Sequence, residues 1–368
     1  MNSENTNTEL EQEPIDPELA ELEDSLDDAE QVEENENAKK AGNIFDTLQE
    51  EISESDLPAA EKNKRLSRLL KASSRRVNIM LVGATGAGKS STINALFDMS
   101  VATVGVGVDP ETKDIERHDL NGNLTIWDSP GLGDGVDTDK LHITQIVKKL
   151  SETDENNELL IDLVLVVLDA SSKDLAVSFD VINNTLIPCL GEENHRILIA
   201  LNKCDMAKSG RYWNNKENTP EDSLVDFLIE KVNSVKRRIY DATGVEVEPV
   251  FFSAGYSDGE EKQSSYNLTK LLYYILQAVP AEKRLVLVDS LNKDEDNWEC
   301  NDEDYMPSIK ETFLEALVSN VTDGAERGGI IGGCSLGVPG IIAGALIGGV
   351  VGALKTLIVR PILILAKK

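Results

Sequence analysis

The feature that most constrains the fold is a glycine-rich segment that directly follows a short apolar run. Residues 77–82 read VNIMLV and carry no charge, which is typical of a buried parallel strand, and GATGAGKS follows at residues 83–90. Residues 90–98 then have a helical pattern. A strand, the spacing GxxxxGK[ST] and a helix in this order predict a phosphate-binding loop.

The residue types in this loop suit the binding of a nucleotide. Glycine lets the backbone approach a ligand closely, so that backbone N–H groups can surround the phosphates. Lys89 supplies a positive charge to the β- and γ-phosphates, and the Ser90 hydroxyl suits Mg²⁺. The loop residues expected at the nucleotide are Gly83, Gly86, Ala87, Gly88, Lys89, Ser90 and Ser91.

Apolar runs and helical patterns alternate along the middle of the chain. Further buried-strand candidates are residues 160–169, 197–202 and 247–253, and helical patterns cover 138–150, 176–187, 221–240 and 267–278. This alternation predicts an α/β, doubly wound, mostly parallel sheet. One antiparallel edge hairpin is expected as well, because Asn121-Gly122 joins residues 114–120 to 123–128 and Asn-Gly favours a two-residue turn.

Two further motifs follow predicted strands. DSPG, from Asp128 to Gly131, places an acid where it can hold Mg²⁺ through water and a glycine N–H where it can contact the γ-phosphate. By itself this sequence is also typical of an ordinary turn. Its position at the end of a strand favours the nucleotide-binding interpretation, because ligands of open α/β sheets lie at the carboxyl ends of the strands.

The second motif, NKCD, predicts that the base is guanine. The carboxylate of Asp205 can accept from guanine N1–H and from the N2 amine, whereas adenine presents an acceptor at N1 and no N2 amine. Asn202 is expected to orient the loop, and the stem of Lys203 to cover one face of the base. After residues 247–252 come Ser253 and Ala254, and we expect the Ala254 N–H to meet guanine O6.

These motifs, in this order, resemble those of GTPases of the TrmE–Era–EngA–septin-like superfamily. The stretches GATGAGKSSTINALF, VGVDPETKDI and IWDSPGLGDG look particularly like the bacterial YfjP/YeeP/YkfA group. The resemblance covers roughly residues 75–285. It implies a P-loop GTPase that hydrolyses GTP to GDP and phosphate with Mg²⁺.

The resemblance also implies a role for a threonine and a slow reaction. Thr112 is the expected switch threonine that completes the Mg²⁺ shell, so the implied catalytic set is Lys89, Thr112 and Gly131, and the metal set is Ser90, Thr112 and Asp128. Thr103, in the same expected loop (101–113), is the alternative. Leu132 stands where Ras-like enzymes have a water-orienting glutamine, which predicts slow hydrolysis without self-association or a partner. Cation-activated relatives have asparagine at the position of Gly86, which leaves potassium stimulation open.

Charge divides the chain into four expected regions. Residues 1–60 hold 20 acidic and 2 basic side chains with few large apolar ones, which predicts a disordered acidic tail. The GTPase domain is expected at 61–290 and an acidic linker with a helix at 291–320. The final region, 321–368, is glycine-rich and apolar, and it is uncharged from residue 328 to 354.

Small residues recur in this final region at a spacing that suits helix contact. Gly340, Gly344, Gly348 and Gly352 lie four residues apart, as in membrane helix pairs, and four basic residues follow. Pro339 argues against one straight membrane span. The sequence leaves two interpretations open for 328–368, which are membrane contact and a glycine-rich hairpin packed on protein.

Composition bears on partners and location. Nucleic-acid binding is not supported, because the formal net charge is −30 and no basic domain is present. The alternative function is nevertheless a cytosolic GTPase of the Era/TrmE type that is related to RNA, the ribosome or tRNA modification. Four scattered cysteines indicate reduced thiols, so a cytoplasmic protein is expected, with contact to the inner membrane open. A homodimer through the GTPase domain or the glycine stripe is also open. His118, His142 and His195 lack metal-ligand spacing, and Tyr212-Trp213 is expected to pack under its loop.

Overall fold

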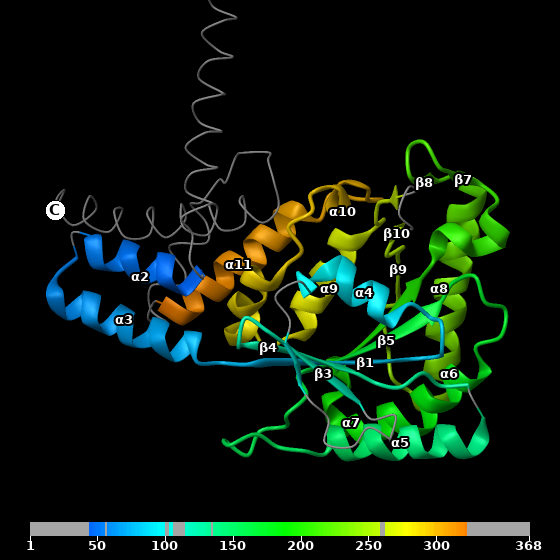
Figure 1. Ribbon diagram of the computed structural model, residues 1–368, viewed down its shortest axis with the longest axis horizontal. Helices are drawn as coiled ribbons and strands as arrows, with labels where there is room; N and C mark the ends of the chain where they lie inside the picture. The colour runs from blue at the N-terminus through cyan, green and yellow to red at the C-terminus, as the bar shows by residue number, and fades with distance from the viewer. Residues whose placement is uncertain are drawn as a thin grey trace, which may run out of the picture. The chain divides into compact units, whose positions relative to one another are not determined.

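The computed structural model describes residues 44–55, 57–99, 103–105, 115–133, 135–257 and 262–321. A seven-stranded sheet in the order β2-β3-β4-β1-β5-β6-β9 forms the centre of this part of the chain (Figure 1). Its strands are β1 (Val77–Gly83), β2 (Thr103–Gly105), β3 (Glu116–Leu120), β4 (Leu124–Asp128), β5 (Leu163–Asp169), β6 (Ile197–Asn202) and β9 (Val250–Phe251).

All pairings of the central strands are parallel, and β3 alone in the sheet runs the other way. β1 pairs in parallel with β4 and β5, and β6 pairs in parallel with β5 and β9. β3 is antiparallel to both β4 and β2. The predicted fold class, a doubly wound and mostly parallel sheet with an antiparallel hairpin, is confirmed.

The turn between β3 and β4 has the conformation that its sequence predicts. Asn121 (φ 49°) and Gly122 (φ 73°) are both in the left-handed region, and Leu120 pairs with Leu124 across the turn. The outermost strand is not part of this hairpin, however. Residues 103–105 form the edge strand β2, whereas the sequence predicted a loop there, because a three-residue strand is too short to give a periodic pattern.

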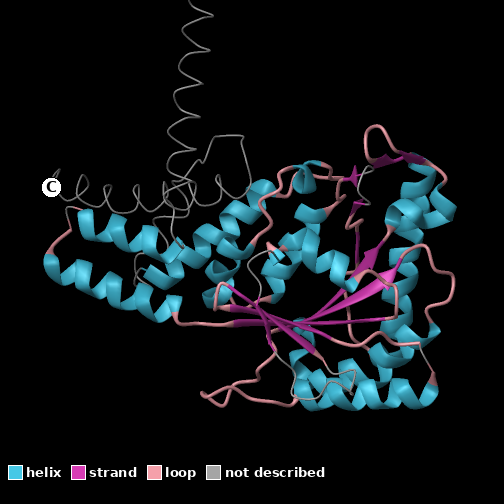
Figure 2. Ribbon diagram, viewed as in Figure 1, coloured by secondary structure: helices cyan, strands magenta, loops and turns pink. Residues whose placement is uncertain are grey.

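Helices cover both faces of the sheet (Figure 2). On one face lie α4 (Lys89–Leu96), α9 (Leu268–Ala278), the 3₁₀ segment η5 (Ala281–Ser290) and α11 (Met306–Val321). On the other face lie α5 (Val136–Leu150), α6 (Ala176–Val181), α7 (Ile187–Leu190) and α8 (Asp222–Thr243). Successive side chains of β1 point to opposite faces of the sheet, and both faces are apolar. Ile79 and Leu81 pack in the core cluster on the α4 and α9 face, and Met80 and Val82 pack in the core cluster on the α5 and α8 face.

The helix expected at 176–187 is longer and less regular than its pattern suggests. A π-helical turn, η2 (Ile182–Leu186), separates α6 from α7, and the chain leaves α7 at Gly191 (φ 55°). A second 3₁₀ segment, η3 (Gly191–Arg196), leads into β6. A third, η4 (Cys204–Gly210), follows β6.

The segment from residue 44 to 60 differs from the expected disordered tail. It contains α2 (Ile44–Glu54) and the start of α3 (Ala59–Ser73). Ile44, Phe45, Leu48 and Ile52 are buried in the main core cluster. The carboxylate of Asp289 accepts the Ile44 N–H, at 2.9 Å to Oδ1 and 3.0 Å to Oδ2. A high density of acids concealed this amphipathic helix, whose apolar positions recur at helical spacing.

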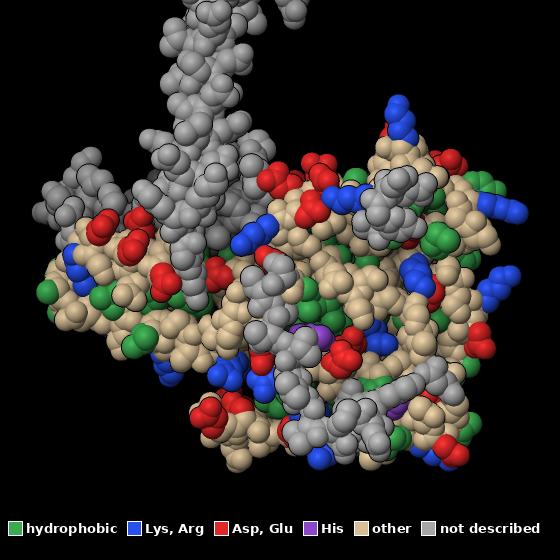
Figure 3. All heavy atoms as spheres, in the orientation of Figure 1, with side chains coloured by type: hydrophobic (Ala, Val, Ile, Leu, Met, Phe, Trp, Pro, Cys, Tyr) green, Lys and Arg blue, Asp and Glu red, His purple; other side chains and the backbone are tan. Residues whose placement is uncertain are grey.

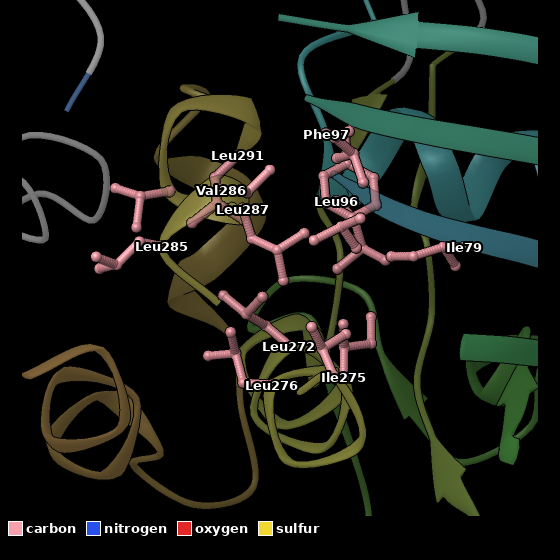
Figure 4. Packing of buried hydrophobic residues seen from close by; sticks show 14 of the residues in the cluster. Ile79, Leu96, Phe97, Leu272, Ile275, Leu276, Leu285, Val286, Leu287 and Leu291 are labelled. Atoms are coloured by element: carbon pink, nitrogen blue, oxygen red, sulfur yellow. The ribbon is translucent and has the colours of Figure 1, made fainter. Parts of the chain in front are cut away.

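Residues 281–321, which include the segment expected as an acidic linker with a helix (291–320), also pack into the core. Figure 4 shows side chains from η5 facing those of α9, α4 and β1, with Leu287 between Leu272 and Leu96. Trp298 of α10 (Asp296–Glu299) and Phe313 of α11 are buried in the same cluster. Residues 44–55 and 281–321 therefore belong to one folded body with the sheet.

Two small hairpins complete the described structure. They are formed by β7 (Trp213–Asn214) with β8 (Thr219–Pro220) and by β10 (Tyr256–Ser257) with β11 (Lys262–Gln263). Trp213 is buried and meets the edge of Tyr266 at 5.3 Å between ring centroids, whereas Tyr212 is exposed. Among the described helices, none combines the length and apolar character that a membrane crossing requires, and residues 328–368 lie outside the described part.

Candidate nucleotide-binding site

The motifs predicted from the sequence meet at one edge of the sheet. In the register of the central strands, Leu81 is opposite Asp128, Gly83 is opposite Val167, and Asp169 is opposite Asn202. These are the carboxyl ends of β1, β4, β5 and β6. Residues that are far apart in the sequence thereby line one site, where open α/β sheets bind ligands.

The phosphate-loop glycines have the conformations and clearances that only glycine allows. Gly86 (φ 75°) and Gly88 (φ 90°) are in the left-handed region, and Gly88 precedes the first turn of α4. A Cβ atom on Gly83 would lie 2.3 Å from the Val167 carbonyl oxygen, and one on Gly88 would lie 2.2 Å from Asn202 Nδ2. The loop is therefore wedged between β5 and the NKCD motif.

Lys89 begins α4 and folds back over the loop. Its Nζ donates to the Gly83 carbonyl at 3.2 Å and lies 3.5 Å from the Ala84 carbonyl. The side chain is almost fully buried. An ammonium group held among loop carbonyls lies where a phosphate oxygen can compete for it.

Ser90 and Asp128, the residues expected to bind the metal, lie within hydrogen-bond distance of each other. The Ser90 hydroxyl donates to Asp128 Oδ2 at 3.2 Å, and Asp128 Oδ1 is buried without a hydrogen-bond partner among the described residues. Burial raises the pKa of Asp128, and the nearby Lys89 charge opposes this effect. A hydroxyl beside a buried carboxylate with spare acceptor capacity fits a hard cation such as Mg²⁺.

Gly131 and Leu132 are attached to the phosphate loop. Thr85 N–H donates to the Leu132 carbonyl at 2.9 Å, and Leu132 N–H donates to the Gly83 carbonyl at 3.2 Å. The Leu132 side chain is only 1% exposed and packs in the core below α5. It therefore anchors this segment in the core.

Asn202 connects three parts of the site. Its Nδ2 donates to the Ala87 carbonyl at 3.1 Å, and its Oδ1 accepts from Lys203 N–H at 2.8 Å and from Ala254 N–H at 3.0 Å. The predicted role of Asn202 in orienting the loop corresponds to these contacts. The Ala254 N–H was expected to be available to guanine O6, but it already donates to Asn202. It would have to share or exchange that hydrogen bond to contact the base.

Lys203 extends along the site towards the phosphate loop. Its Nζ donates to the Gly86 carbonyl at 2.6 Å and to Asp169 Oδ2 at 3.0 Å. Burial alone would raise the pKa of Asp169, but hydrogen bonds from Ser171 and Lys203 outweigh it and lower the pKa. Asp169 thus remains a carboxylate that fixes the lysine.

Asp205 is the clearest candidate for base recognition. It is 7% exposed, and its Oδ1 is buried with no hydrogen-bond partner in the part of the chain that the structure describes. Leaving a buried carboxylate oxygen without a donor is costly, so a donor from a ligand fits here. The adjacent Cys204 is fully buried, and burial raises the pKa of its thiol well above the usual value, so it stays neutral.

The remaining predicted residues are placed as follows. Ser91 is exposed on α4, and Ser253 is buried, with its hydroxyl accepting from Gly255 N–H at 3.2 Å. Thr112 lies outside the described residues, and of Thr103 only the backbone is described, in β2. Asp137 is exposed on α5. Within the described ranges, no cluster of three or more His, Cys, Asp or Glu side chains could hold a metal.

Two residues of the site were not predicted from the sequence. Asp169 ends a buried strand, as Asp128 and Asn202 do, and that shared position was the signal that could have identified it. His142 has no such signal, because its contact with the Gly131 carbonyl, at 3.1 Å from Nδ1, is made only when α5 folds against the DSPG motif.

Comparison with known families agrees with this geometry. Residues 78–203, from the first strand to the NKCD motif, match the model of a family described as 50S ribosome-binding GTPase. This segment has the P-loop GTPase fold. The match ends before Asp205 and includes neither α2 and α3 nor the helices that follow the NKCD motif.

Curated relatives of the GTPase domain are distant. Interferon-gamma-inducible GTPase 10 of Mus musculus is 24% identical over 255 residues, which are 67% of this chain and 54% of that protein. Septin-8 of Xenopus tropicalis is 38% identical over 69 residues, which are 17% of this chain and 16% of that protein. The chain thus spans about half, or less, of the length of these relatives.

Solved structures are similar in part. Toc33 of Arabidopsis thaliana, in complex with GDP and Mg²⁺, is 16% identical with a TM-score of 0.38, over 67% of this chain and 98% of that chain. The G domain of the FeoB iron transporter of T. maritima is 19% identical with a TM-score of 0.31, over 55% of this chain and 99% of that chain. These likenesses are too weak to support an inference about function.

Proposed function

We propose that the chain binds GTP with Mg²⁺ and hydrolyses it slowly to GDP and phosphate, as a molecular switch. The observation that carries this proposal is the buried, unpartnered Asp205 Oδ1 at the strand edge that also bears the phosphate loop. Guanine offers two donors, at N1 and at the N2 amine, that a carboxylate can accept. Adenine offers an acceptor at N1, which would leave this oxygen unpaired and repelled.

The same edge supplies the residues for the phosphates and the cation. The loop N–H groups and Lys89 would bind the β- and γ-phosphates, Ser90 and Asp128 would hold Mg²⁺, and Thr112 would join them in the GTP form. Bound Mg²⁺ supplies charge neutralisation for the transferred phosphoryl group. The chain's own contribution is to orient the phosphates along the loop and to present the Gly131 N–H to the γ-phosphate.

Slow hydrolysis follows from the identity and burial of Leu132. A leucine cannot hydrogen-bond to the attacking water, and this one is 1% exposed in the core. We infer that a partner, or a second copy of this chain, stimulates the reaction. Single-turnover hydrolysis measured over a range of protein concentrations tests this point, and a fast rate that is independent of concentration contradicts it.

A nucleotide titration of the full chain tests the specificity. We expect tight binding of GTP and GDP and at least tenfold weaker binding of ATP, since one charged hydrogen bond contributes about 1.5–3 kcal/mol. Asp205→Asn should lose the guanine preference, while Asp137→Asn, on an exposed side chain, serves as the control and should bind as the wild type does. Equal affinities of the wild type for GTP and ATP would refute the assignment.

The cellular role is proposed on the sequence alone. We propose a cytoplasmic protein in which residues 328–368 contact the inner membrane or form the interface of a homodimer. Fractionation of the full chain against a 1–325 truncation tests this, and the truncation retains all of α11, which ends at Val321. Equal partition of the two proteins contradicts membrane contact by that segment.

The alternative is a GTPase that acts on RNA or the ribosome, and the matching family is described as a 50S ribosome-binding GTPase. Basic and acidic side chains of the described residues are interspersed on the face seen in Figure 3. Such a surface offers weak non-specific attraction to phosphate backbones. Sedimentation of the full chain with ribosomes in the GTP form would favour this alternative over membrane contact.

A further inference from the structure

A buried histidine contacts the backbone of the DSPG motif. His142 lies on α5, is 1% exposed, and has its Nδ1 3.1 Å from the Gly131 carbonyl oxygen. Because a carbonyl oxygen can only accept, Nδ1 must carry the proton and act as the donor. The nucleotide-binding role described above does not use this side chain.

The segment that His142 contacts is held on its other side by the phosphate loop. The Leu132 N–H and carbonyl are bonded to Gly83 and Thr85, and the Leu132 side chain is buried. Gly131 itself is pressed against Thr85, since a Cβ atom on it would lie 2.2 Å from Thr85 Oγ1. The hydrogen bond from His142 adds a restraint on the peptide group that joins Gly131 to Leu132.

These restraints leave one backbone group of Gly131 for a ligand. Its carbonyl accepts from His142, whereas its N–H makes no hydrogen bond to any described residue. The N–H lies in the peptide group that joins Pro130 to Gly131, and the carbonyl bonded to His142 lies in the next peptide group. The two groups are linked through the backbone torsions of Gly131, so restraining one limits the positions open to the other. By holding the Gly131 carbonyl, His142 restrains one end of the residue whose N–H should meet the γ-phosphate.

We propose that His142 is a positioning residue that holds Gly131 for recognition of the γ-phosphate. The proposal rests on the proposed GTP-binding function. It gives α5 a direct connection to the nucleotide, because any movement of Gly131 towards or away from the γ-phosphate is transmitted through the His142 ring. In this proposal His142 of α5 supports the DSPG motif by a hydrogen bond, whereas Leu132 supports it only by the burial of its side chain.

A residue that merely fills the core would affect both nucleotide states alike. GDP lacks the γ-phosphate, so its affinity does not depend on the Gly131 N–H in this scheme, whereas that of a nonhydrolysable GTP analogue does. The ratio of the two affinities thus separates positioning from packing. The conservative variant His142→Asn adds a second criterion, because the asparagine Nδ2 is joined to Cβ through the same number of bonds as the histidine Nδ1.

The experiment titrates the full chain, with Mg²⁺, against GDP and GMPPNP. His142→Leu removes the donor and should weaken GMPPNP binding about threefold to tenfold while GDP affinity changes by less than about twofold. His142→Asn should restore GMPPNP affinity to within about twofold of the wild type. His142→Gln, whose amide nitrogen lies one bond further out, should resemble His142→Leu and replaces it if that variant does not fold. His195→Leu, at an exposed histidine, is the control.

Three results would overturn the proposal. Equal weakening of GDP and GMPPNP by the loss of the donor assigns His142 to packing alone. Identical behaviour of His142→Asn and His142→Gln removes the hydrogen bond as the cause. If the wild-type chain does not bind GDP at all, both the nucleotide-binding function and this inference are refuted. The wild-type titration therefore separates failure of the proposed function from failure of the role of His142.

Discussion

Asp289 offers a test of how α2 is attached to the rest of the protein. Both of its carboxylate oxygens accept the Ile44 N–H, at the first turn of α2. Burial, together with the nearby Asp46 charge, raises its pKa from an ordinary 3.8 to about 6, even though the Ile44 N–H favours the charged form. A buried carboxylate is thus retained at neutral pH at some cost in stability.

The sign and size of this cost follow from the two pKa values. Between pH 4 and pH 6 the folded state binds more protons at Asp289 than the unfolded state does, so stability falls as pH rises through this window. A shift of about two units corresponds to roughly 3 kcal/mol at pH 8, of which about 1.4 kcal/mol develops between pH 5 and pH 8. Asp289→Asn keeps an oxygen acceptor for Ile44 and removes the charge.

Urea denaturation of the wild type and Asp289→Asn, followed by circular dichroism from pH 5 to pH 8, measures this cost. The stability of the variant relative to the wild type should increase by about 1.4 kcal/mol across that range. Other carboxylates are common to both proteins and cancel in the difference. Asp137→Asn, at an exposed side chain, should show no such trend. A difference between wild type and Asp289→Asn that does not change with pH would falsify the reasoning.

Three further substitutions test other parts of the structure. Gly88→Ala should lower nucleotide affinity at least tenfold in a titration with GDP, because its Cβ would lie 2.2 Å from Asn202 Nδ2 at a left-handed φ. Lys283→Met should destabilise by about 3–5 kcal/mol in urea, since it strands the buried Asp162 carboxylate 2.7 Å away, and adding Asp162→Asn should recover much of the loss. Phe313→Ala should cost about 3–5 kcal/mol because α11 is part of the core, and a loss below about 1 kcal/mol would contradict that assignment.

The sequence alone determined the features that depend on short-range chemistry. A charge-free run, a glycine loop and a lysine must lie next to one another in space because they are adjacent in the chain, and Asn121-Gly122 turns the chain locally. The predicted strands, the phosphate loop and the position of the NKCD motif followed from such patterns. Residues at strand ends were also predicted to meet, because parallel strands bring their carboxyl ends to one edge.

Only the tertiary structure decided which remote groups complete the core and the site. Asp289 lies 245 residues from Ile44, and no local pattern predicts that the two meet. The acids of α2 and of the segment expected as a linker predicted solvated segments, but their apolar side chains are part of the main core cluster, because burial of one face outweighs a charged opposite face. Likewise, the spacing of the histidines excluded a metal site and gave no hint of the contact from His142 to Gly131. That contact exists because α5 packs on one face of the sheet beside the DSPG motif, and helix packing is set by shape complementarity that no single segment encodes.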